Sequence, residues 1–319
     1  SPVEPFIATF PAEGLKEEEI RVEVRDSEGK VMLTYQADKP EIKPVPDPAK
    51  AAKEPKEIAS MEQLFLTGLH LEQYRHATYN PMDYYQEALR REPGDVRCNN
   101  AIGLLLMRKG QFAAAEKYFR TAVDTLTERN PNPYDGEPYY NLGWSCKMQG
   151  KMDEAYDAFF KSAWNAAWQD AAYYALAQID TARGKYESAL DKVERSLIRN
   201  WHNHKARQLK ASILRKLNRK EEALELIRES LKIDRFNMGC RFEHYLLTED
   251  LLAEMTGLMR RWEHTFIEYA LDFGGAGLYD EAILFLESYL SETRKVYPMI
   301  YYALGYFHAC RGEKAHALD

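Results

Sequence analysis

The sequence has 319 residues, of which 45% are hydrophobic and 29% are charged. This composition excludes a chain that is disordered throughout, because it offers enough apolar surface for a sizeable core. The net charge of -7 and the pI of about 5.7 argue against nucleic acid or an anionic membrane as the main partner. No apolar run reaches the ~18 residues that would span a bilayer.

Two β-strands are predicted near the start of the chain. Apolar and polar residues alternate over 20–25 and over 31–36, and residues 27–29 between them supply a turn. Residues 4–10 are a candidate third strand. Because so small a sheet needs a cover for its apolar face, the β segment over 1–38 is interpreted either as the end of an upstream β domain or as a hairpin that docks on the first helices.

The chain begins at Ser1 without an initiator methionine and shows no signal peptide. We therefore expect it to be part of a longer protein. The sequence favours the cytoplasm but leaves both the compartment and the oligomeric state open. Residues 39–59 are predicted to be a linker, because their five prolines disfavour helix and sheet.

Small and aromatic residues recur at fixed spacing after this linker. Gly143, Gly150, Ala155 and Phe159 form one set, and steps of 34 residues from Ala155 reach further alanines at 189 and 223. This pattern resembles the tetratricopeptide repeat. The resemblance implies a mainly α fold over residues 60–319, a right-handed α-solenoid of about six to seven helical hairpins.

The turn inside each hairpin is predicted to need a left-handed residue, which glycine supplies most easily and asparagine next. Asn218 stands where the other copies have glycine. The equivalent glycines are Gly110, Gly150, Gly184, Gly277 and Gly312. Between Ser230 and Ser288 the spacing exceeds one repeat, which predicts an inserted helical pair near 238–258.

The first repeat, over residues 61–92, is predicted to be degenerate. Asn80 is expected to cap its second helix, with Pro81 in the first turn. The run before it carries His70, Glu72, Arg75 and His76. On a helix, Glu72 is expected to meet Arg75 or His76 in a polar contact rather than to form a site.

This run, with the β hairpin before it, resembles a second group of proteins. They are large bacterial proteins in which a galactose-mutarotase-like β-sandwich domain of unknown function precedes tetratricopeptide repeats. The resemblance rests on residues 68–78 and 84–97 and implies a carbohydrate-related context. It carries over no catalytic residue.

No chemistry-bearing motif is found elsewhere. The sequence lacks a nucleophile elbow, a P-loop and a Rossmann fingerprint, and residues 274–277 are interpreted as a turn between helices. The four cysteines, at 98, 146, 240 and 310, have no CxxC spacing and are predicted to be structural. We expect no catalytic residue, no metal and no cofactor.

Function is therefore expected to come from a surface. The tetratricopeptide resemblance implies that first helices build an inner, concave face at set positions of each repeat. The candidate binding residues are Arg97, Asn100, Arg108, Tyr140, Trp144, Lys147, Tyr174, Gln178, Lys205 and Arg215. Such a groove is expected to be aromatic and locally basic. Aromatic and arginine side chains are the ones that most often anchor an interface. Tyr140 and Trp144 are equally compatible with packing on neighbouring helices.

Two functions remain open at this point. The first is a non-catalytic protein–protein interaction scaffold that binds a peptide or partner domain, with an acidic ligand favoured. The second is the accessory region of a larger carbohydrate-active bacterial enzyme. An intramolecular contact with an upstream β domain is compatible with either function, whereas nucleic acid and membrane are not expected as partners.

Overall fold

The computed structural model describes residues 7–39, 45, 47, 50–250, 252–260, 262–292, 297–313 and 317. The chain divides into two compact units, Ser1–Ala52 and Lys53–Asp319. No helix in the described part of the chain is long and apolar enough to cross a bilayer.

The first unit contains one β hairpin. After a short 3-10 helix, η1 (Glu17–Glu19), strand β1 (Arg21–Arg25) pairs antiparallel with β2 (Val31–Gln36). The carbonyl of Asp26 accepts a hydrogen bond from the Gly29 amide, and Gly29 has the positive φ of +83° that this turn requires. The two predicted strands are confirmed. Of the candidate third strand, residues 7–10 are not extended into a sheet, and residues 4–6 lie outside the described residues.

One face of this hairpin is apolar. The register places Val22 opposite Tyr35 and Val24 opposite Leu33, so the four side chains share a face. Each of them is between 51% and 64% exposed. The described residues of this unit therefore leave the face uncovered. The two predicted covers, an upstream β domain or the first helices, remain predictions.

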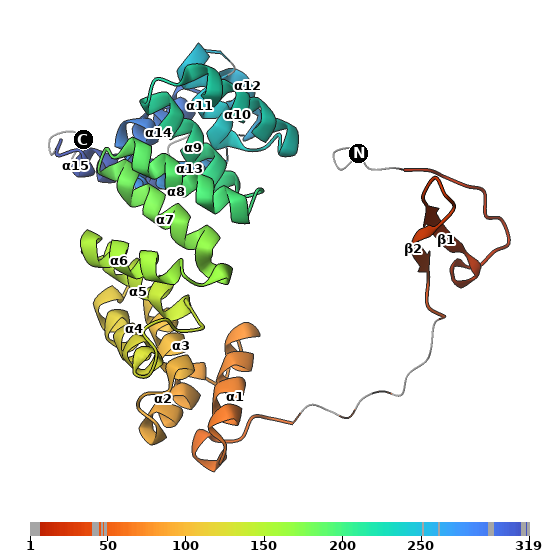
Figure 1. The fold of residues 1–319 in the computed structure, drawn as a ribbon, viewed down its shortest axis with the longest axis vertical. Coiled ribbons are helices and arrows are strands. Elements are labelled where there is room, and N and C mark those ends of the chain that lie inside the picture. The colour runs from red at the N-terminus through yellow and green to blue at the C-terminus, as the bar shows by residue number, and fades with distance from the viewer. Residues whose placement is uncertain are drawn as a thin grey trace. The chain divides into compact units, whose positions relative to one another are not determined.

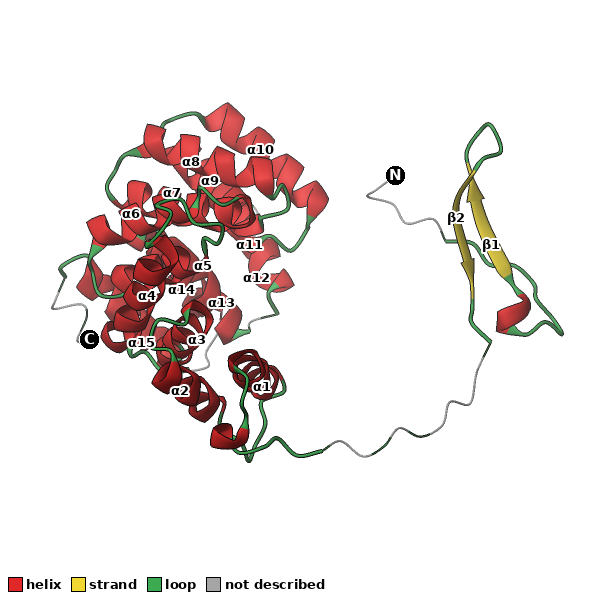
Figure 2. Ribbon diagram, turned by 60° about the horizontal axis from the view of Figure 1, so that its bottom comes forward, coloured by secondary structure: helices red, strands yellow, loops and turns green. Residues whose placement is uncertain are grey.

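The second unit is built from helices (Figure 1). Its first half contains η2 (Pro55–Glu57), α1 (Met61–Gln73), α2 (Pro81–Arg91), α3 (Val96–Met107), α4 (Phe112–Thr127), α5 (Glu137–Lys147), α6 (Met152–Ser162), η3 (Ala166–Trp168), α7 (Gln169–Ala182) and α8 (Tyr186–Arg199). Its second half contains α9 (His204–Lys216), α10 (Lys220–Ile233), α11 (Met238–Thr248), α12 (Leu252–Leu258), α13 (Glu263–Gly275), α14 (Tyr279–Glu292) and α15 (Pro298–Cys310). Figure 2 shows strands only in the hairpin of the first unit. The predicted fold class, mainly α with a short β piece, is confirmed.

In the first three hairpins, a glycine on the first helix admits an aromatic ring from the second. Gly68 faces Tyr85, Gly103 faces Phe119 and Gly143 faces Phe159. A Cβ atom at any of the three glycines would lie less than 3.0 Å from the ring. The small residues of the repeat pattern therefore set how closely the two helices approach.

The turn inside the hairpins has the predicted left-handed residue. Gly150 has a φ of +75°, and Asn218, which replaces glycine in a later copy, has a φ of +60°. The other turn glycines, at 110, 184, 277 and 312, have φ between +70° and +84°. Asn80 caps α2 as predicted, since its side chain accepts a hydrogen bond from the Met82 amide.

The end of the predicted linker is folded. Ile58 is buried, the Lys53 carbonyl accepts a hydrogen bond from the Tyr84 hydroxyl at 3.0 Å, and Arg91 donates to the Ile58 carbonyl at 2.7 Å. The compact unit thus begins at Lys53 rather than at residue 60. Proline density concealed this, because Pro55 begins a 3-10 helix instead of preventing one.

Residues 238–258, where an inserted helical pair was predicted, form α11 and α12. After them, α13 and α14 contact the first helices of earlier repeats through Lys147 and Arg215. Phe242 on α11 contacts Phe273 and Phe285, with ring centroids 5.6 and 4.8 Å away. A single core cluster extends from Ala177 to Phe307. The solenoid therefore closes on itself in its second half.

Candidate functional site: the inner face of the first helices

Amide side chains join the first helices of neighbouring hairpins. Asn141 on α5 donates to Asn100 Oδ1 on α3 at 2.9 Å, and Asn100 donates to Glu137 Oε1 at 2.9 Å. Both asparagines are at least half-buried, so they fix α3 against α5. Asn100 was predicted to contact a partner, but its side-chain amide nitrogen and oxygen are both hydrogen-bonded within the chain.

The cations predicted for this face have carboxylate partners. Arg97 pairs with Glu62 and Arg108 with Glu72, each at 2.6 Å. The further pairs are Lys205 with Asp272, Arg215 with Glu243 and Glu281, and Lys216 with Glu281. The expectation of a basic groove is therefore corrected: its positive charge is largely compensated by the chain itself.

Lys147 is the exception among these cations, because its partners are neutral. Its ammonium donates to Gln178 Oε1 at 2.8 Å and to the Gly275 carbonyl at 3.1 Å. It also lies 4.8 Å from the ring centroid of Trp144. Burial lowers the pKa of Lys147 to about 8. Among the described residues, Lys147 is thus a cation without a carboxylate partner at the junction of α5, α7 and α13.

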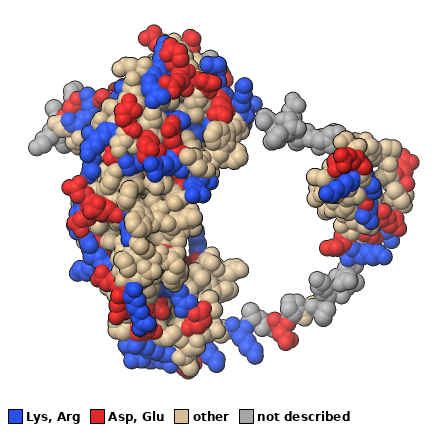
Figure 3. Space-filling model, in the orientation of Figure 1, with Lys and Arg blue, Asp and Glu red and all other residues tan. Residues whose placement is uncertain are grey.

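Aromatic side chains line the face beside Lys147. Tyr140 lies 5.6 Å from Phe159, 6.4 Å from Trp144 and 4.9 Å from Trp168, measured between ring centroids. Tyr140, Trp144 and Trp168 are half-buried rather than buried. Figure 3 shows few charged side chains over α5 to α7, whereas both ends of the repeat unit carry many. Trp168 was not among the residues predicted for the concave groove, because it precedes α7 instead of standing at a repeat position.

The other half of the predicted groove is filled by the chain's own helices. Lys205 and Arg215 bind Asp272 on α13 and Glu281 on α14. Gln178 is buried beside Gly275, and Tyr174 packs on the same core cluster. Tyr174, Gln178, Lys205 and Arg215 are therefore structural contacts of the closed half. The other predicted residues of the inner face lie on α3 and α5 or directly after α3.

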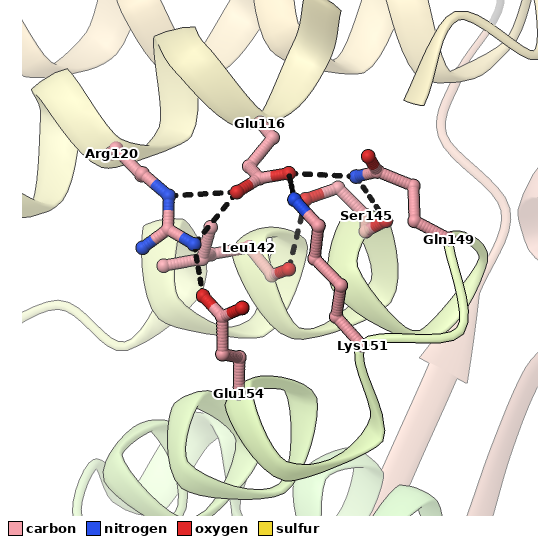
Figure 4. Close-up of polar contacts among 7 residues, drawn as sticks. All are labelled: Glu116, Arg120, Leu142, Ser145, Gln149, Lys151 and Glu154. Carbon is pink, nitrogen blue, oxygen red and sulfur yellow. Dashed lines mark hydrogen bonds and ion pairs between the residues drawn. The ribbon is translucent and has the colours of Figure 1, made fainter. Parts of the chain in front are cut away.

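A buried carboxylate lies between the hairpins of α4, α5 and α6 (Figure 4). Glu116 accepts hydrogen bonds from Lys151 at 2.6 Å, Gln149 at 2.8 Å and Arg120 at 2.8 Å. Arg120 also binds Glu154. Burial opposes ionisation of Glu116, but these hydrogen bonds outweigh it and hold its pKa at about 2.

The same cluster has the ligand types of a metal site. Oxygen atoms of Glu116 and Glu154 and the sulfur of Cys146 lie within 4.8 Å of one another. Arg120 and Lys151 already occupy the carboxylate oxygens that a cation would need, and burial raises the pKa of the Cys146 thiol. The arrangement is thus a structural ion-pair network.

The run before α2 makes different contacts from those predicted. Glu72 binds Arg108 and accepts a hydrogen bond from the Tyr85 hydroxyl at 3.1 Å, instead of meeting Arg75 or His76. His76 Nδ1 accepts from the backbone amides at 78 and 79. The helix ends at Gln73, so Glu72 and the two later residues do not share a helical face. Through Glu72, residues 68–78 contact α2 and the end of α3 and so help to hold the first two repeats together.

Family models of the tetratricopeptide repeat match residues 83–133 and 204–237, so the chain contains repeats of this type. Similar solved structures include a tetratricopeptide repeat protein from Parabacteroides merdae ATCC 43184, 20% identical over 70% of this chain and 89% of that chain, with a TM-score of 0.46. A Pseudomonas aeruginosa pilF structure is 14% identical over 78% of this chain and 96% of that chain, with a TM-score of 0.49. YrrB, titled a TPR protein with an unusual peptide-binding site, is 15% identical over 72% and 99%, with a TM-score of 0.43.

Proposed function

We propose that this chain is a non-catalytic interaction scaffold that binds a peptide or a partner protein on the inner face of α1, α3 and α5. The observation that carries the proposal is the pair Tyr140 and Trp144, which stay half-exposed although α13 covers the neighbouring half of the same face. Aromatic side chains held in this way are the usual anchors of an interface.

The charges of this face suit a partner that is mainly apolar and carries a carboxylate. Arg97 and Arg108 are paired, yet their side chains remain 44% and 61% exposed, so they keep N–H donors that face water. A carboxylate from the partner gains little net charge attraction from such pairs. Affinity is therefore expected to come from Trp144 and Tyr140. Arg97 and Arg108 are expected to orient the carboxylate of the partner.

A paired set of variants tests this proposal. Trp144→Ala with Arg108→Glu is expected to remove the native partner in a pull-down, while helicity by circular dichroism stays unchanged. The matched control is Glu187→Lys with Glu225→Lys, two exposed positions on the second helices α8 and α10. The partner is identified by mass spectrometry and its affinity is then measured with the purified component. Loss of binding in the control with retention in the Trp144 variant would refute the proposal.

The alternative, an accessory region of a larger carbohydrate-active protein, rests on the resemblance of residues 68–78 and 84–97. The contacts of Glu72 and His76 described above stabilise the first repeat and add no support for it. The interaction scaffold is therefore the function that the geometry favours.

A further inference from the structure

A pocket of about 250 Å³ lies between α9, α13 and the turn from α10 to α11. Helix α9 contributes Lys205 and Gln208 to its lining, the turn contributes Asp234, and α13 contributes Glu268 and Asp272. The volume is smaller than the ~300 Å³ at which sites for drug-sized ligands begin. The pocket therefore suits a single side chain of a partner rather than a molecule of cofactor size.

Gln208 is a buried side chain whose hydrogen-bonding groups are unused. The residue is 3% exposed, and within the part of the chain that the structure describes its side-chain amide forms no hydrogen bond. Gly239 on α11 makes room for it, because a Cβ at Gly239 would lie 2.4 Å from Gln208 Cγ. A buried amide without a partner destabilises a fold. A ligand that enters the pocket and hydrogen-bonds to Gln208 removes that penalty.

The ionisable groups of the lining are mainly acidic. Three of them are the carboxylates of Asp234, Glu268 and Asp272, and the basic groups among the described residues of the lining are Lys205 and His204. Lys205 pairs with Asp272 at 2.6 Å, and His204 Nε2 lies 3.9 Å from Asp234 Oδ2. Even with His204 protonated, the carboxylates outnumber the cations. The net charge of -7 of the chain acts in the same direction, so the pocket selects a cation.

The carboxylate of Glu268 has no ion-pair or hydrogen-bond partner among the described residues. Burial raises the pKa of Asp272, the hydrogen bond from Lys205 opposes this rise, and Glu268 adds to it. Lys205 therefore compensates the negative charge of this part of the pocket only in part. A second cation beside Glu268 would complete the compensation.

The spacing of these groups favours an organic cation over a metal ion. Among the described residues, no three histidine or carboxylate ligand atoms of the pocket lie within 4.8 Å of one another. A metal ion needs ligands that converge, whereas a guanidinium offers five N–H donors spread over a plane. Tyr269 also lines the pocket, and its hydroxyl donates to the Phe236 carbonyl at 3.1 Å. The ring is thereby held in place for a guanidinium to stack on it.

We propose that this pocket binds an arginine side chain of a partner polypeptide. The guanidinium donates hydrogen bonds to the amide oxygen of Gln208 and to the carboxylates of Asp234 and Glu268, and its alkyl chain packs along Tyr269. The partner segment is basic, since the same acidic lining repels acidic peptides and nucleic acid alike. The proposal is independent of the binding proposed for the inner face of α1, α3 and α5.

The proposal is tested on the full chain with an acetylated and amidated peptide, Gly-Ser-Arg-Ser-Gly. The matched peptide carries citrulline, whose urea group has the shape of the guanidinium but no charge. Affinities are measured by ligand-observed NMR, which detects weak complexes. The arginine peptide is expected to bind more tightly than the citrulline peptide, by about tenfold or more, and to bind less tightly as salt rises. Equal affinity of the two peptides, or no binding of the arginine peptide up to about 10 mM, would overturn the proposal.

Variants of the lining should weaken this binding. Glu268→Gln with Asp234→Asn is expected to weaken it about tenfold or more. The asparagine still offers an oxygen to the Phe236 amide, which Asp234 binds at 2.8 Å. Gln208→Met keeps the length of the side chain and removes the amide, and it is expected to weaken binding about fivefold. Circular dichroism shows whether each variant is folded, and unchanged affinity in both folded variants contradicts the proposal.

Lys205→Gln provides a test of opposite sign. It removes the cation with which the ligand competes for Asp272, so the arginine peptide should bind more tightly. A purely structural role of the pocket predicts no such gain, and weaker or unchanged binding counts against the proposal.

Two control variants and a second ligand complete the test. Glu187→Gln with Glu225→Gln removes the same charge from exposed positions on α8 and α10 and should leave affinity unchanged. Trp144→Ala with Arg108→Glu should also leave it unchanged, so this pocket and the inner face fail or succeed independently. Agmatine, a free small molecule with the same guanidinium, tests the other source of this group. A loss in either control variant equal to that in the Glu268 variant, or tighter binding of agmatine than of the arginine peptide, would each refute the assignment.

Discussion

At the scale of single residues, Glu116 and Lys147 have surroundings with opposite effects on their charged forms. Glu116 is surrounded by three donors, one from its own helix α4 and two from the turn between α5 and α6, so its charged form is favoured in the folded state. Lys147 donates only to neutral oxygens, so its charged form is disfavoured. Glu116 therefore stabilises the stack of repeats at neutral pH, whereas the charged form of Lys147 lowers the stability of the folded chain.

The pKa of Lys147 predicts a specific dependence of stability on pH. The folded chain has a pKa of about 8 at this site and the unfolded chain the ordinary value of 10.5, so between these values the unfolded state binds more protons. The free energy of unfolding should therefore rise with pH across this window, by roughly 2–3 kcal/mol. Lys147→Met should remove this rise, as measured by urea denaturation at pH 7.5 to 10. Parallel curves for the two proteins would contradict the assignment.

Glu116 predicts the opposite sign at acidic pH. Its folded pKa of about 2 lies below the ordinary value of 4.5, so its contribution is present above pH 4.5 and is lost as pH falls towards 2. Glu116→Gln should lower the free energy of unfolding by about 1–3 kcal/mol at pH 7 and by much less near pH 2. The control is Glu154→Gln, whose carboxylate is 53% exposed. It should cost less than about 1 kcal/mol. Equal costs would show that burial of the ion pair is unimportant.

At the scale of elements, the hairpins follow from local sequence. A left-handed turn residue acts on its own backbone, so Gly150 and Asn218 predicted their turns without any tertiary contact. Asn80 predicted the start of α2 for the same reason. The ion pair of Lys205 with Asp272 was not predictable in this way, because those residues are 67 positions apart in the sequence and meet only through tertiary packing.

Substitutions in one hairpin separate backbone strain from packing. Gly150→Ala should cost about 1–2 kcal/mol, because φ is +75° and nothing lies within 4 Å of the added Cβ. Gly143→Ala should cost more, since its Cβ would lie 2.7 Å from the Phe159 ring. Asn218→Gly should change stability by less than about 0.5 kcal/mol. Chemical denaturation gives all three values, and a larger cost for Gly150→Ala than for Gly143→Ala would reverse this explanation.

At the scale of the whole molecule, the two halves of the repeat unit are constructed differently. The hairpins of α1 to α4 contact their neighbours, as in any open solenoid, whereas Lys147 on α5 already reaches the Gly275 carbonyl on α13. In the second half, Arg215 and Lys216 on α9 bind Glu281 on α14, and Phe242 contacts rings of two later helices. Such long-range contacts predict that α7 to α14 unfold as one cooperative block. The sequence predicted a mainly helical fold of hairpins but not these contacts, because no repeat pattern specifies contacts across several repeats.

Amide hydrogen exchange should report this block. Gly277→Ala introduces a Cβ that would lie 2.7 Å from the Ala182 side chain at a φ of +72°, where α13 and α14 meet the end of α7. It should accelerate exchange in α7, α9 and α13 together. Gly110→Ala is the matched control, since its φ is +70° and nothing lies within 4 Å. It should affect α3 and α4 alone. Local acceleration in both variants would mean that the closure is not cooperative.

The closure also has a mechanical consequence. An open stack of hairpins extends and recoils like a spring, because each interface shears independently, whereas a block whose late helices are bonded to its early ones resists stretching. Under a load applied between Lys53 and Ala317, the hairpins of α1 to α6 should therefore lengthen and unravel first, in small steps. The part from α7 onward should stay folded until it unfolds in a single larger event. The surface of Tyr140 and Trp144 would then lie in the part that extends easily, and the filled groove in the part that resists extension.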